Sequence, residues 1–286
     1  MKTKFEQQVA FSQGHIFPRR YRNVQNLPHW HREHELILVE SGSVTVTVGG
    51  NLFTLHEGNA AFLHSEEVHC IKADPGAVTA IAKLDTPHFQ KLLGDNRLLS
   101  PILTGSYVQK ATFDALFDEI SRQDRYSSVI ADSIATQLIA QMLRHEQTVK
   151  SASAEPGTVK RYKELLDRIQ GSHADITFEE AAAQMHFCKP YFSKFFCTQT
   201  GMSFTHYLNT IRISIAVERL QEGGATVTEV SQSCGFNTIR NFNRVFKKMT
   251  GFCPNALPKD YHFIHPQKEF SDSGFDPTLS CTEVLE

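Results

Sequence analysis

One segment of this chain occurs twice. The run 192–196 (FSKFF) is followed three residues later by Thr200-Gly201, and fifty positions further on the run 242–246 (FNRVF) is followed at the same spacing by Thr250-Gly251. Each copy comes after a short stretch of helical character. The repeat therefore predicts two similar helical modules in tandem, with each copy as the second helix of a helix-turn-helix.

Charge is distributed unevenly along the 286 residues, a length sufficient for two domains. The net charge of −2 combines 13 Lys and Arg against 9 Asp and Glu in residues 158–262, 15 against 17 in residues 1–157, and 1 against 5 in residues 263–286. The basic excess accompanies the repeat, as a phosphate-facing module requires, although so modest an excess also occurs on ordinary solvated surfaces.

Cysteine use and hydropathy indicate a cytoplasmic protein. The six cysteines are scattered without a Cys-x-x-Cys pair, which favours reduced thiols over a disulfide framework. Residues 1–11 contain no apolar run, so we expect no secretory leader. No stretch approaches the roughly 20 apolar residues of a membrane span, so we expect no membrane partner.

Residues 15–85 have the pattern of short strands. β-branched residues alternate over 44–48, Gly49-Gly50 follows as a hairpin turn, and a second strand resumes at 51–55. Regular strands and turns predict a sandwich or a barrel.

Helical periodicity follows the strands. One predicted face consists of Phe113, Leu116, Phe117 and Ile120. A second stripe consists of Ile130, Ile134, Leu138 and Met142. Such a helix either completes the core or forms a dimer seam, and we expect a homodimer.

Composition divides the chain into four parts. Residues 1–147 hold the strands and the first helices, and residues 148–158 (TVKSASAEPGT) are small and polar like a linker. Residues 159–262 consist of short helices, and residues 263–286 are an acidic tail that we expect to be disordered.

Both copies of the repeat have the features of a helix-turn-helix. Thr177 with Glu180, and Thr226 with Glu229, have capping-box spacing before a short first helix. The outward residues of the second helices are Lys189, Pro190, Ser193, Lys194 and Cys197 in the first copy, and Ile239, Arg240, Asn241, Asn243, Arg244 and Lys247 in the second. Arg and Asn have the donor geometry for guanine and adenine edges. An ordinary solvated helix face is the alternative for either copy alone, and the duplication favours DNA.

Residues 159–262 resemble the DNA-binding domain of the AraC/XylS family of bacterial transcription regulators. The specific part is 235–254, which matches the family signature over some twenty positions. The resemblance implies two helix-turn-helix units joined by a long helix at 204–221, with double-stranded DNA and RNA polymerase as partners. It assigns base reading to Pro190, Ser193, Lys194, Ile239, Arg240, Asn241 and Arg244.

The first copy departs from that family pattern at its turn. His186 stands where the family usually has Gly, and Cys188 stands at the N-cap in place of Ser or Thr. Each departure destabilises the unit by about 1 kcal/mol. The second copy keeps Gly235 at the turn and has Asn237 or Thr238 as its cap, so we expect it to be the better-formed reader.

The most specific motif of the N-terminal part is His29-Trp30-His31, followed by Glu35 and Gly42. His69 comes much later in the sequence. This stretch resembles the cupin pattern, in which two His and a carboxylate converge with a later His inside a small β-barrel on a divalent metal. The match is partial. Three interpretations stay open: a metal site, a metal-free effector site, and structural packing, each made of His29, His31, Glu35 and His69.

Two neighbours of these residues have separate predictions. His34 should point away from His31 because strand residues alternate. Trp30 should cover the exterior of the barrel or stack on a sugar. Sugar-responsive members are common in the AraC/XylS family, so the resemblance suggests a sugar as one candidate effector.

Together these features predict an α+β multidomain fold, with an N-terminal cupin-like β-barrel and following helices, and a C-terminal all-α tandem helix-turn-helix domain. The predicted function is transcription regulation by sequence-specific DNA binding, controlled by a small-molecule effector in an effector-binding and dimerisation domain at 1–147. The rivals are a metal-dependent cupin enzyme with a helical appendage and a helical adaptor that binds only protein; we expect no enzyme.

Overall fold

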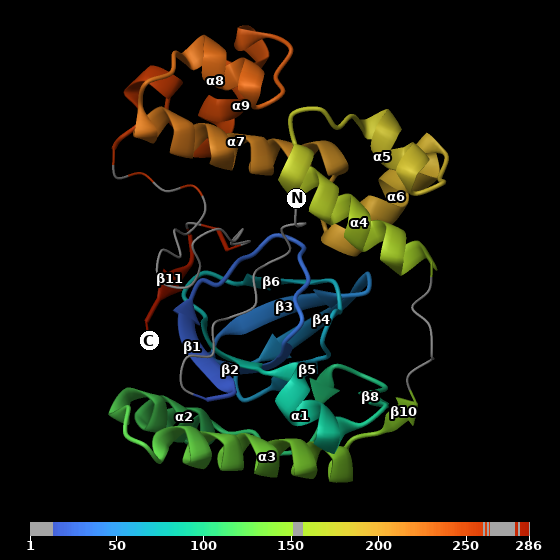
Figure 1. Ribbon diagram of the computed structural model, residues 1–286, viewed down its shortest axis with the longest axis vertical. Helices are drawn as coiled ribbons and strands as arrows, with labels where there is room; N and C mark the ends of the chain where they lie inside the picture. The colour runs from blue at the N-terminus through green and yellow to red at the C-terminus, as the bar shows by residue number, and fades with distance from the viewer. Residues whose placement is uncertain are drawn as a thin grey trace.

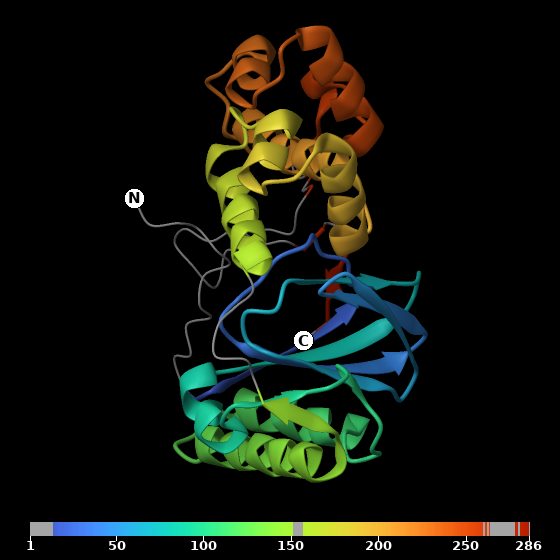
Figure 2. The ribbon, with the colours of Figure 1, turned by 90° about the vertical axis from the view of Figure 1, so that its right-hand side faces the viewer.

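The computed structural model describes residues 14–150, 157–259, 261, 263, 278, 279 and 281–285. Residues 14–150 form the N-terminal domain, and residues 157–259 form the helical domain above it in Figure 1. Turned by 90° in Figure 2, the N-terminal domain shows its strands in the middle of the molecule and a pair of helices beneath them.

Eleven strands are described. They are β1 (Ile16–Arg22), β2 (His34–Ser41), β3 (Ser43–Val48), β4 (Asn51–His56), β5 (Ala60–Leu63), β6 (His69–Ala73), β7 (Val78–Leu84), β8 (Asn96–Leu98), β9 (Ile102–Leu103), β10 (Thr148–Lys150) and β11 (Glu283–Val284). One sheet has the order β11-β1-β7-β2-β5-β9 and a second has the order β4-β3-β6, while β8 pairs with β10.

The predicted hairpin and fold class are confirmed. β3 and β4 pair antiparallel around Gly49 and Gly50, both of which have positive φ as a type I′ turn requires. The predicted β-barrel needs correction, because the strands of the described chain form separate sheets that do not close into a single barrel. The segment after β1 leaves the six-stranded sheet and pairs with β6 at Gln25↔Lys72 and His29↔His69, so it links the two sheets at one end.

Alternation along β2 produces two cores. Ile37 and Val39 lie in the apolar cluster between the sheets, whereas Leu36 and Leu38 lie in the cluster between the six-stranded sheet and the helices. Ile37 is fully buried, and burial of such a side chain stabilises the fold by about 1.5–3 kcal/mol. β2 is therefore apolar on both faces, as the middle layer of a three-layer domain requires.

Three helices cover the outer face of the six-stranded sheet: α1 (Thr86–Leu93), α2 (Lys110–Arg122) and α3 (Ser127–His145). The first predicted apolar face is confirmed, with Phe113 and Leu116 buried. The second stripe is divided: Leu138 and Met142 are buried in the core, but Ile130 is 43% exposed. Only the C-terminal part of that stripe thus serves as core.

The helical domain contains α4 (Gly157–Ser172), α5 (Phe178–Gln184), α6 (Lys189–Thr200), α7 (Phe204–Glu222), α8 (Val227–Ser233), α9 (Ile239–Thr250) and a 3-10 turn at Pro254–Ala256. α5 and α6 form the first helix-turn-helix unit, α8 and α9 form the second, and α7 connects them as predicted (Figure 1). Both capping boxes are present. None of the described helices is long and apolar enough to cross a bilayer.

The turns of the two units differ as the sequence predicts. His186 has a φ of 57° and Gly235 a φ of 80°. A Cβ at Gly235 would lie 2.3 Å from the Ala174 carbonyl oxygen, so glycine is required there for space as well as for conformation. The N-cap Cys188 makes no side-chain cap hydrogen bond, whereas Thr238 accepts one from the Asn241 N–H.

Two predicted boundaries need correction. Thr148–Lys150, assigned to the linker, form β10, and α4 begins already at Gly157; residues 151–156 lie outside the described residues. The predicted disorder of the tail is wrong at its end, because Glu283–Val284 pair with β1 and Thr282 is buried. Most of the remaining tail lies outside the described residues. Composition could not predict this strand, because two residues are too few to show the alternating pattern of a strand.

We predict that His186→Gly and Cys188→Ser each raise the stability of the first unit by about 1 kcal/mol. The first substitution relieves a left-handed backbone at an exposed non-glycine residue, and the second supplies a capping oxygen. Urea unfolding followed by circular dichroism measures both. Gly235→Ala in the second unit is the control and should lower the stability of that unit. If His186→Gly and Gly235→Ala changed the free energy of unfolding in the same direction, the two turns would not differ as proposed.

Candidate functional site

The predicted DNA-reading residues lie on the outward faces of α6 and α9. The exposed set on α6 is Lys189, Pro190, Ser193 and Lys194, and on α9 it is Ile239, Arg240, Asn241, Asn243, Arg244 and Lys247. Phe192 and Phe196 on the opposite face of α6, and Phe242 and Phe246 on that of α9, are buried. Each second helix thus has one apolar and one polar face, as a recognition helix needs.

Local contacts distinguish the two recognition faces. In the second unit Asn241 Oδ1 accepts a hydrogen bond of 2.9 Å from Arg244 Nη2, which orients the guanidinium on the helix surface. In the first unit Lys189 Nζ lies 2.6 Å from Glu179 Oε1, so part of its charge is neutralised within the unit. The second unit therefore presents the stronger positive face.

Inside the N-terminal domain, the structure brings together the four residues that the sequence singled out. His29, His31, Glu35 and His69 are buried, none exposing more than 3% of its surface. Glu35 Oε2 lies 2.9 Å from His31 Nε2 and 3.6 Å from His69 Nε2, and the ring centroids of His29 and His69 are 4.4 Å apart. We call these four residues the histidine cluster.

Backbone carbonyls set the tautomer of each imidazole in the histidine cluster. The Nδ1 atoms of His29, His31 and His69 lie 2.8, 3.1 and 2.8 Å from the carbonyl oxygens of Leu27, Glu33 and Glu67. Because a carbonyl oxygen only accepts, each Nδ1 carries the proton. Each ring therefore directs its other nitrogen, Nε2, toward the centre of the cluster, as metal-ligating histidines do.

The carboxylate of Glu35 is held in its charged form. Burial alone would raise its pKa, but hydrogen bonds from His31 and His69 hold the pKa well below its usual range. Glu33, which sequence reasoning missed, is buried as well, with Oε2 3.4 Å from His31 Nδ1. Its position two residues after the HxH motif was the signal that could have identified it.

The neighbours of the histidine cluster point away from it. His34 stacks on Phe62 with ring centroids 5.5 Å apart, on the helix side of the sheet, as predicted. Trp30 lies outside the strands, where its Nε1 donates to Asp167 Oδ1 of α4 at 3.2 Å. The exterior position of Trp30 is thus confirmed, and a helix of the other domain covers it.

A second group of buried titratable residues lies beside His34. His64 Nε2 accepts a hydrogen bond from the Leu98 N–H at 2.9 Å, and His34 Nδ1 accepts one from the Ser65 N–H at 3.0 Å. Burial, with the neighbouring His34 and Arg97, lowers the pKa of His64 to about 3. Both imidazoles are therefore neutral, and they hold the turns around β8.

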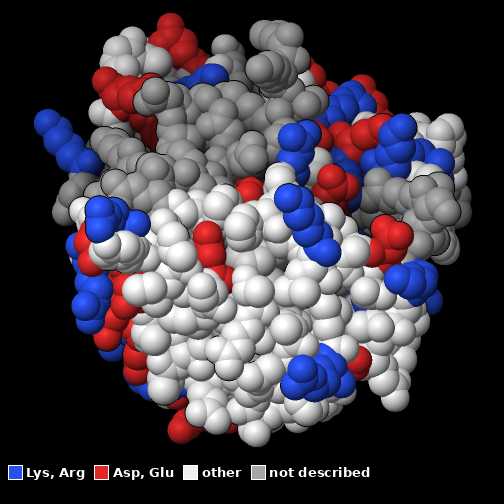
Figure 3. All heavy atoms as spheres, turned by 60° about the horizontal axis from the view of Figure 1, so that its bottom comes forward, with Lys and Arg blue, Asp and Glu red and all other residues white. Residues whose placement is uncertain are grey.

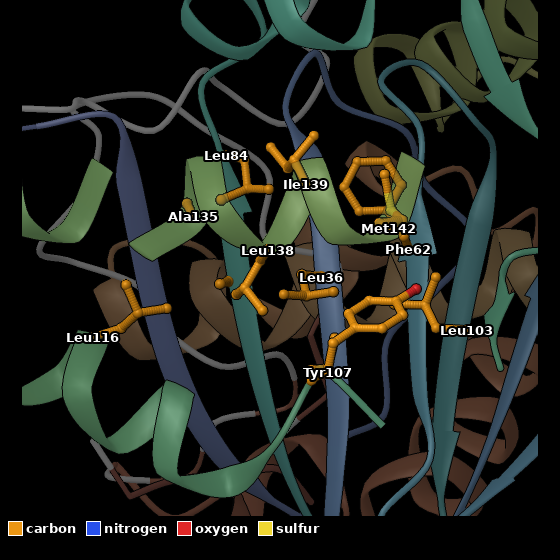
Figure 4. Close-up of a pocket in the computed structure, with 12 residues that line it drawn as sticks. Leu36, Phe62, Leu84, Leu103, Tyr107, Leu116, Ala135, Leu138, Ile139 and Met142 are labelled. Carbon is orange, nitrogen blue, oxygen red and sulfur yellow. The ribbon is translucent and has the colours of Figure 1, made fainter. Parts of the chain in front are cut away.

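An apolar pocket lies between the six-stranded sheet and the helices beneath it (Figure 4). Leu36 and Phe62 line it from the sheet, Leu138 and Met142 from α3, and Tyr107 lies at its edge. The centre of a water molecule fits within only about 10 Å³ of it, which is room for about one water molecule. In this conformation the pocket is thus too small for a sugar.

Known proteins share both halves of this arrangement. Residues 17–139 match the family model of an AraC-like ligand binding domain, and residues 181–259 match that of a helix-turn-helix domain. The chain belongs to the AraC family of transcription regulators.

Individual relatives of this AraC-family regulator are distant. It is 25% identical over 239 residues to the HTH-type transcriptional activator RhaS of Klebsiella pneumoniae (strain 342), covering 80% of this chain and 86% of the relative. It is 23% identical to RhaS of Escherichia coli (strain K12 / DH10B) with the same coverage. Among solved structures, ToxT of Vibrio cholerae O395 is similar with a TM-score of 0.41, 12% identity, and coverage of 86% of this chain and 96% of that chain.

The family assignment covers every site described above. The ligand-binding match at 17–139 includes the histidine cluster and most of the residues that line the apolar pocket. The helix-turn-helix match at 181–259 includes both recognition helices of the AraC-family regulator. DNA binding and ligand binding therefore belong to separate domains.

We predict that the N-terminal domain loses stability as the pH falls below 6.5. The unfolded chain protonates His64 near pH 6.5, but the folded domain takes up that proton only near pH 3, so acid favours unfolding by up to about 1.4 kcal/mol per pH unit. Urea unfolding between pH 7.5 and 4.5 measures the slope. His64→Gln should make the slope shallower, because an amide oxygen can accept the Leu98 N–H without titrating, while His34, whose pKa burial lowers to about 4, still contributes. The exposed His56→Gln is the control. An unchanged slope in His64→Gln would refute the assignment.

Proposed function

We propose that this AraC-family regulator reads a specific double-stranded DNA sequence with α6 and α9. The observation that carries the proposal is the pair of capped helix-turn-helix units, each with an aromatic inner face and an exposed polar outer face. Two recognition helices in one chain can enter successive major-groove segments.

The chemistry of the outer faces assigns a role to each residue. Arg240 and Arg244 fit guanine edges, Asn241 and Asn243 fit adenine, and Ile239 fits the thymine methyl group. Lys189, Lys194 and Lys247 suit phosphates, which supply affinity that falls with salt. Pro190 and Ser193 complete the reading face of the first unit. The second unit carries more of the sequence preference because its face holds both arginines.

The ligand-binding domain supplies the control. We propose that the histidine cluster is the effector site, since three buried imidazoles converge there and the buried Glu35 carboxylate lies beside two of them. The apolar pocket of Figure 4 is packed core in this conformation. A sugar effector remains a prediction of the family resemblance.

Several further assignments complete the proposed function. We place the regulator in the bacterial cytoplasm, where promoter DNA lies, and we propose RNA polymerase as its partner there. We propose no enzymatic activity. The rival metal-dependent cupin enzyme needs a base beside an open metal position, whereas the group beside the histidine cluster, Glu33, is itself buried against His31.

We predict that Arg240→Ala and Arg244→Ala each weaken specific DNA binding by about 1–3 kcal/mol, or roughly 5- to 150-fold. Arg240→Ala should also relax the sequence preference, because Arg244 is partly held by Asn241. Genomic mapping of bound sites supplies the DNA, and fluorescence anisotropy measures the affinity.

The matched control for the arginine variants is Lys160→Ala. Lys160 is an exposed basic residue of α4, outside both helix-turn-helix units. Wild-type affinity in both arginine variants would show that α9 is oriented differently from the proposal.

We also propose that α3 forms a homodimer seam. Tyr126, Val129 and Ile130 are 53%, 62% and 43% exposed at its N-terminal end. Asp132 is the single charged residue of α3 before Arg144, and His15 pairs with it. Figure 3 shows that the bottom of the molecule, which contains α2 and α3 in Figure 1, has a broad region with few charged side chains. An uncharged patch with exposed apolar residues is typical of a protein interface.

We predict that Val129→Asp with Ile130→Asp converts a dimer into monomers. Two buried, unpaired carboxylates would oppose the interface, while both positions are exposed in the single chain, so folding should be retained. Light scattering after gel filtration measures the mass. Leu52→Asp, at a 67% exposed position on β4, is the control. A dimeric double variant would place the interface elsewhere.

A further inference from the structure

We propose that the histidine cluster binds one divalent transition-metal cation, and that this cation holds the first helix-turn-helix unit against the N-terminal domain. The inference rests on the proposed function and names the ligand of its effector site. The observation behind it is that two short segments, 27–31 and 66–69, contribute three residues of the cluster and also contact α4 and α7, which share an apolar cluster with α5 and α6 of the first unit.

The donor set of the cluster fits a transition-metal cation. All three Nδ1 atoms are engaged by backbone carbonyls, so the Nε2 atoms of His31 and His69 face Glu35 Oε2, at 2.9 and 3.6 Å. In the absence of metal, ring protons can lie between these atoms as hydrogen bonds to Glu35, and a bound cation would take the place of those protons. Three imidazole nitrogens and one carboxylate are the ligands preferred by Zn²⁺, Co²⁺, Ni²⁺, Mn²⁺ and Fe²⁺.

Burial and formal charge favour an ion over an organic ligand. Each cluster residue exposes 3% or less of its surface, so a sugar would have to displace the surrounding strands. Glu33 and Glu35 place two carboxylates in this interior, and their ion-pair partners are histidines. A divalent cation balances both charges. Glu33 Oε2 lies 3.4 Å from the protonated Nδ1 of His31. In this position its carboxylate can orient the His31 ring without binding the cation itself.

Strand alternation gives each segment two functions. His29 and His69 exchange backbone hydrogen bonds of 3.0 and 2.9 Å, so the two segments pair directly at the ligands. His29, His31 and His69 point into the cluster. Trp30, which lies between His29 and His31, and Val68, which precedes His69, point out toward the helical domain.

The outward residues are part of the core of the helical domain. Leu27 and Val68 are 1% and 8% exposed and pack in one apolar cluster with residues of α4 and α7. Tyr207 Oη of α7 donates to the Pro28 carbonyl oxygen at 3.1 Å. This contact and the apolar cluster fix α7 directly above the first segment.

α4 covers Trp30 with charged groups. Asp167 Oδ1 accepts from Trp30 Nε1 at 3.2 Å, and Lys163 Nζ lies 4.9 Å from the centre of the Trp30 ring and 3.4 Å from Glu66 Oε2. The cation–π contact and the hydrogen bond connect α4 to the residue between two ligands. A cation that draws His29 and His31 together therefore fixes the surface on which α4 is docked.

Thermodynamic linkage makes this connection reciprocal. If the cation favours the docked first unit, loosening the dock must weaken cation binding by the same factor, typically 5- to 150-fold for coupled sites. Trp30 is the single tryptophan of the chain, so its fluorescence reports on the docking surface.

The first test asks whether the site binds a cation. The full chain, stripped of metal with EDTA, is titrated with Co²⁺ and followed by visible absorption and calorimetry, with Zn²⁺ as competitor. We expect one equivalent, and at least tenfold weaker binding in Glu35→Gln and in His69→Gln, with wild-type circular dichroism as the folding check. Glu33→Gln, outside the ligand set, should weaken binding about tenfold.

The control for this titration is His88→Gln. It alters the other histidine group of the described chain, the partly exposed His15, His88 and Asp132, and should leave the affinity unchanged. Less than stoichiometric binding by the wild type, or unchanged binding in both ligand variants, would overturn the cation site.

The second test asks whether the cation and the dock are coupled. Lys163→Ala with Asp167→Ala removes both polar contacts to Trp30 without touching a ligand, and should weaken Co²⁺ binding at least fivefold. Lys160→Ala with Glu164→Ala removes the same charges from exposed positions of α4 and should not. A saturating concentration of Co²⁺ should change the fluorescence emission of Trp30 in the wild type. The change should be smaller in the variant that carries Lys163→Ala and Asp167→Ala. Equal affinities in both double variants would refute the coupling.

DNA binding separates this inference from the proposed function. Specific DNA binding without stoichiometric cation binding would end the inference and leave the proposed function standing. Stoichiometric cation binding by a chain that binds no specific DNA would refute the proposed function and leave the cation site standing.

Discussion

The backbone pairing of His29 with His69 is the constraint on which the arrangement of this molecule depends. It is made by a segment that has left the six-stranded sheet and joins β6 of the other sheet. Because residues alternate on both sides of that pairing, it gathers three imidazoles on the inner side and turns Trp30 and Val68 outward. One pair of backbone hydrogen bonds thus places the candidate effector site directly beneath the contact with the helical domain.

The two helix-turn-helix units differ in how they are stabilised. The second has a glycine turn, a threonine cap and an apolar cluster of its own around Phe242 and Phe246. The first has His186 in a left-handed conformation and no side-chain cap at Cys188, and its apolar cluster includes Leu27 and Val68 of the N-terminal domain. Part of the stability of the first unit therefore comes from docking, which is the condition for the N-terminal domain to influence it.

Local signals explain what the sequence could predict. The capping boxes, the Gly49-Gly50 hairpin and the turn at Gly235 depend on neighbours within a few residues, and all are confirmed. The convergence of His29, His31, Glu35 and His69 was predictable because it repeats a spacing known from cupins. The placement of Glu283 beside β1 and of Asp167 beside Trp30 depends on contacts between segments far apart in the chain, for which a single sequence has no pattern.

The two candidate ligand positions differ in how directly they adjoin the helical domain. A ligand shifts a conformational equilibrium only by the difference between its affinities for the two states. A molecule in the apolar pocket of Figure 4 would contact α3 and the helix side of the six-stranded sheet, on the opposite side of the sheet from the core shared with β3 and β6. A ligand among His29, His31 and His69 instead contacts residues whose immediate neighbours carry α4 and α7. The histidine cluster, unlike the apolar pocket, therefore adjoins the contacts with α4 and α7.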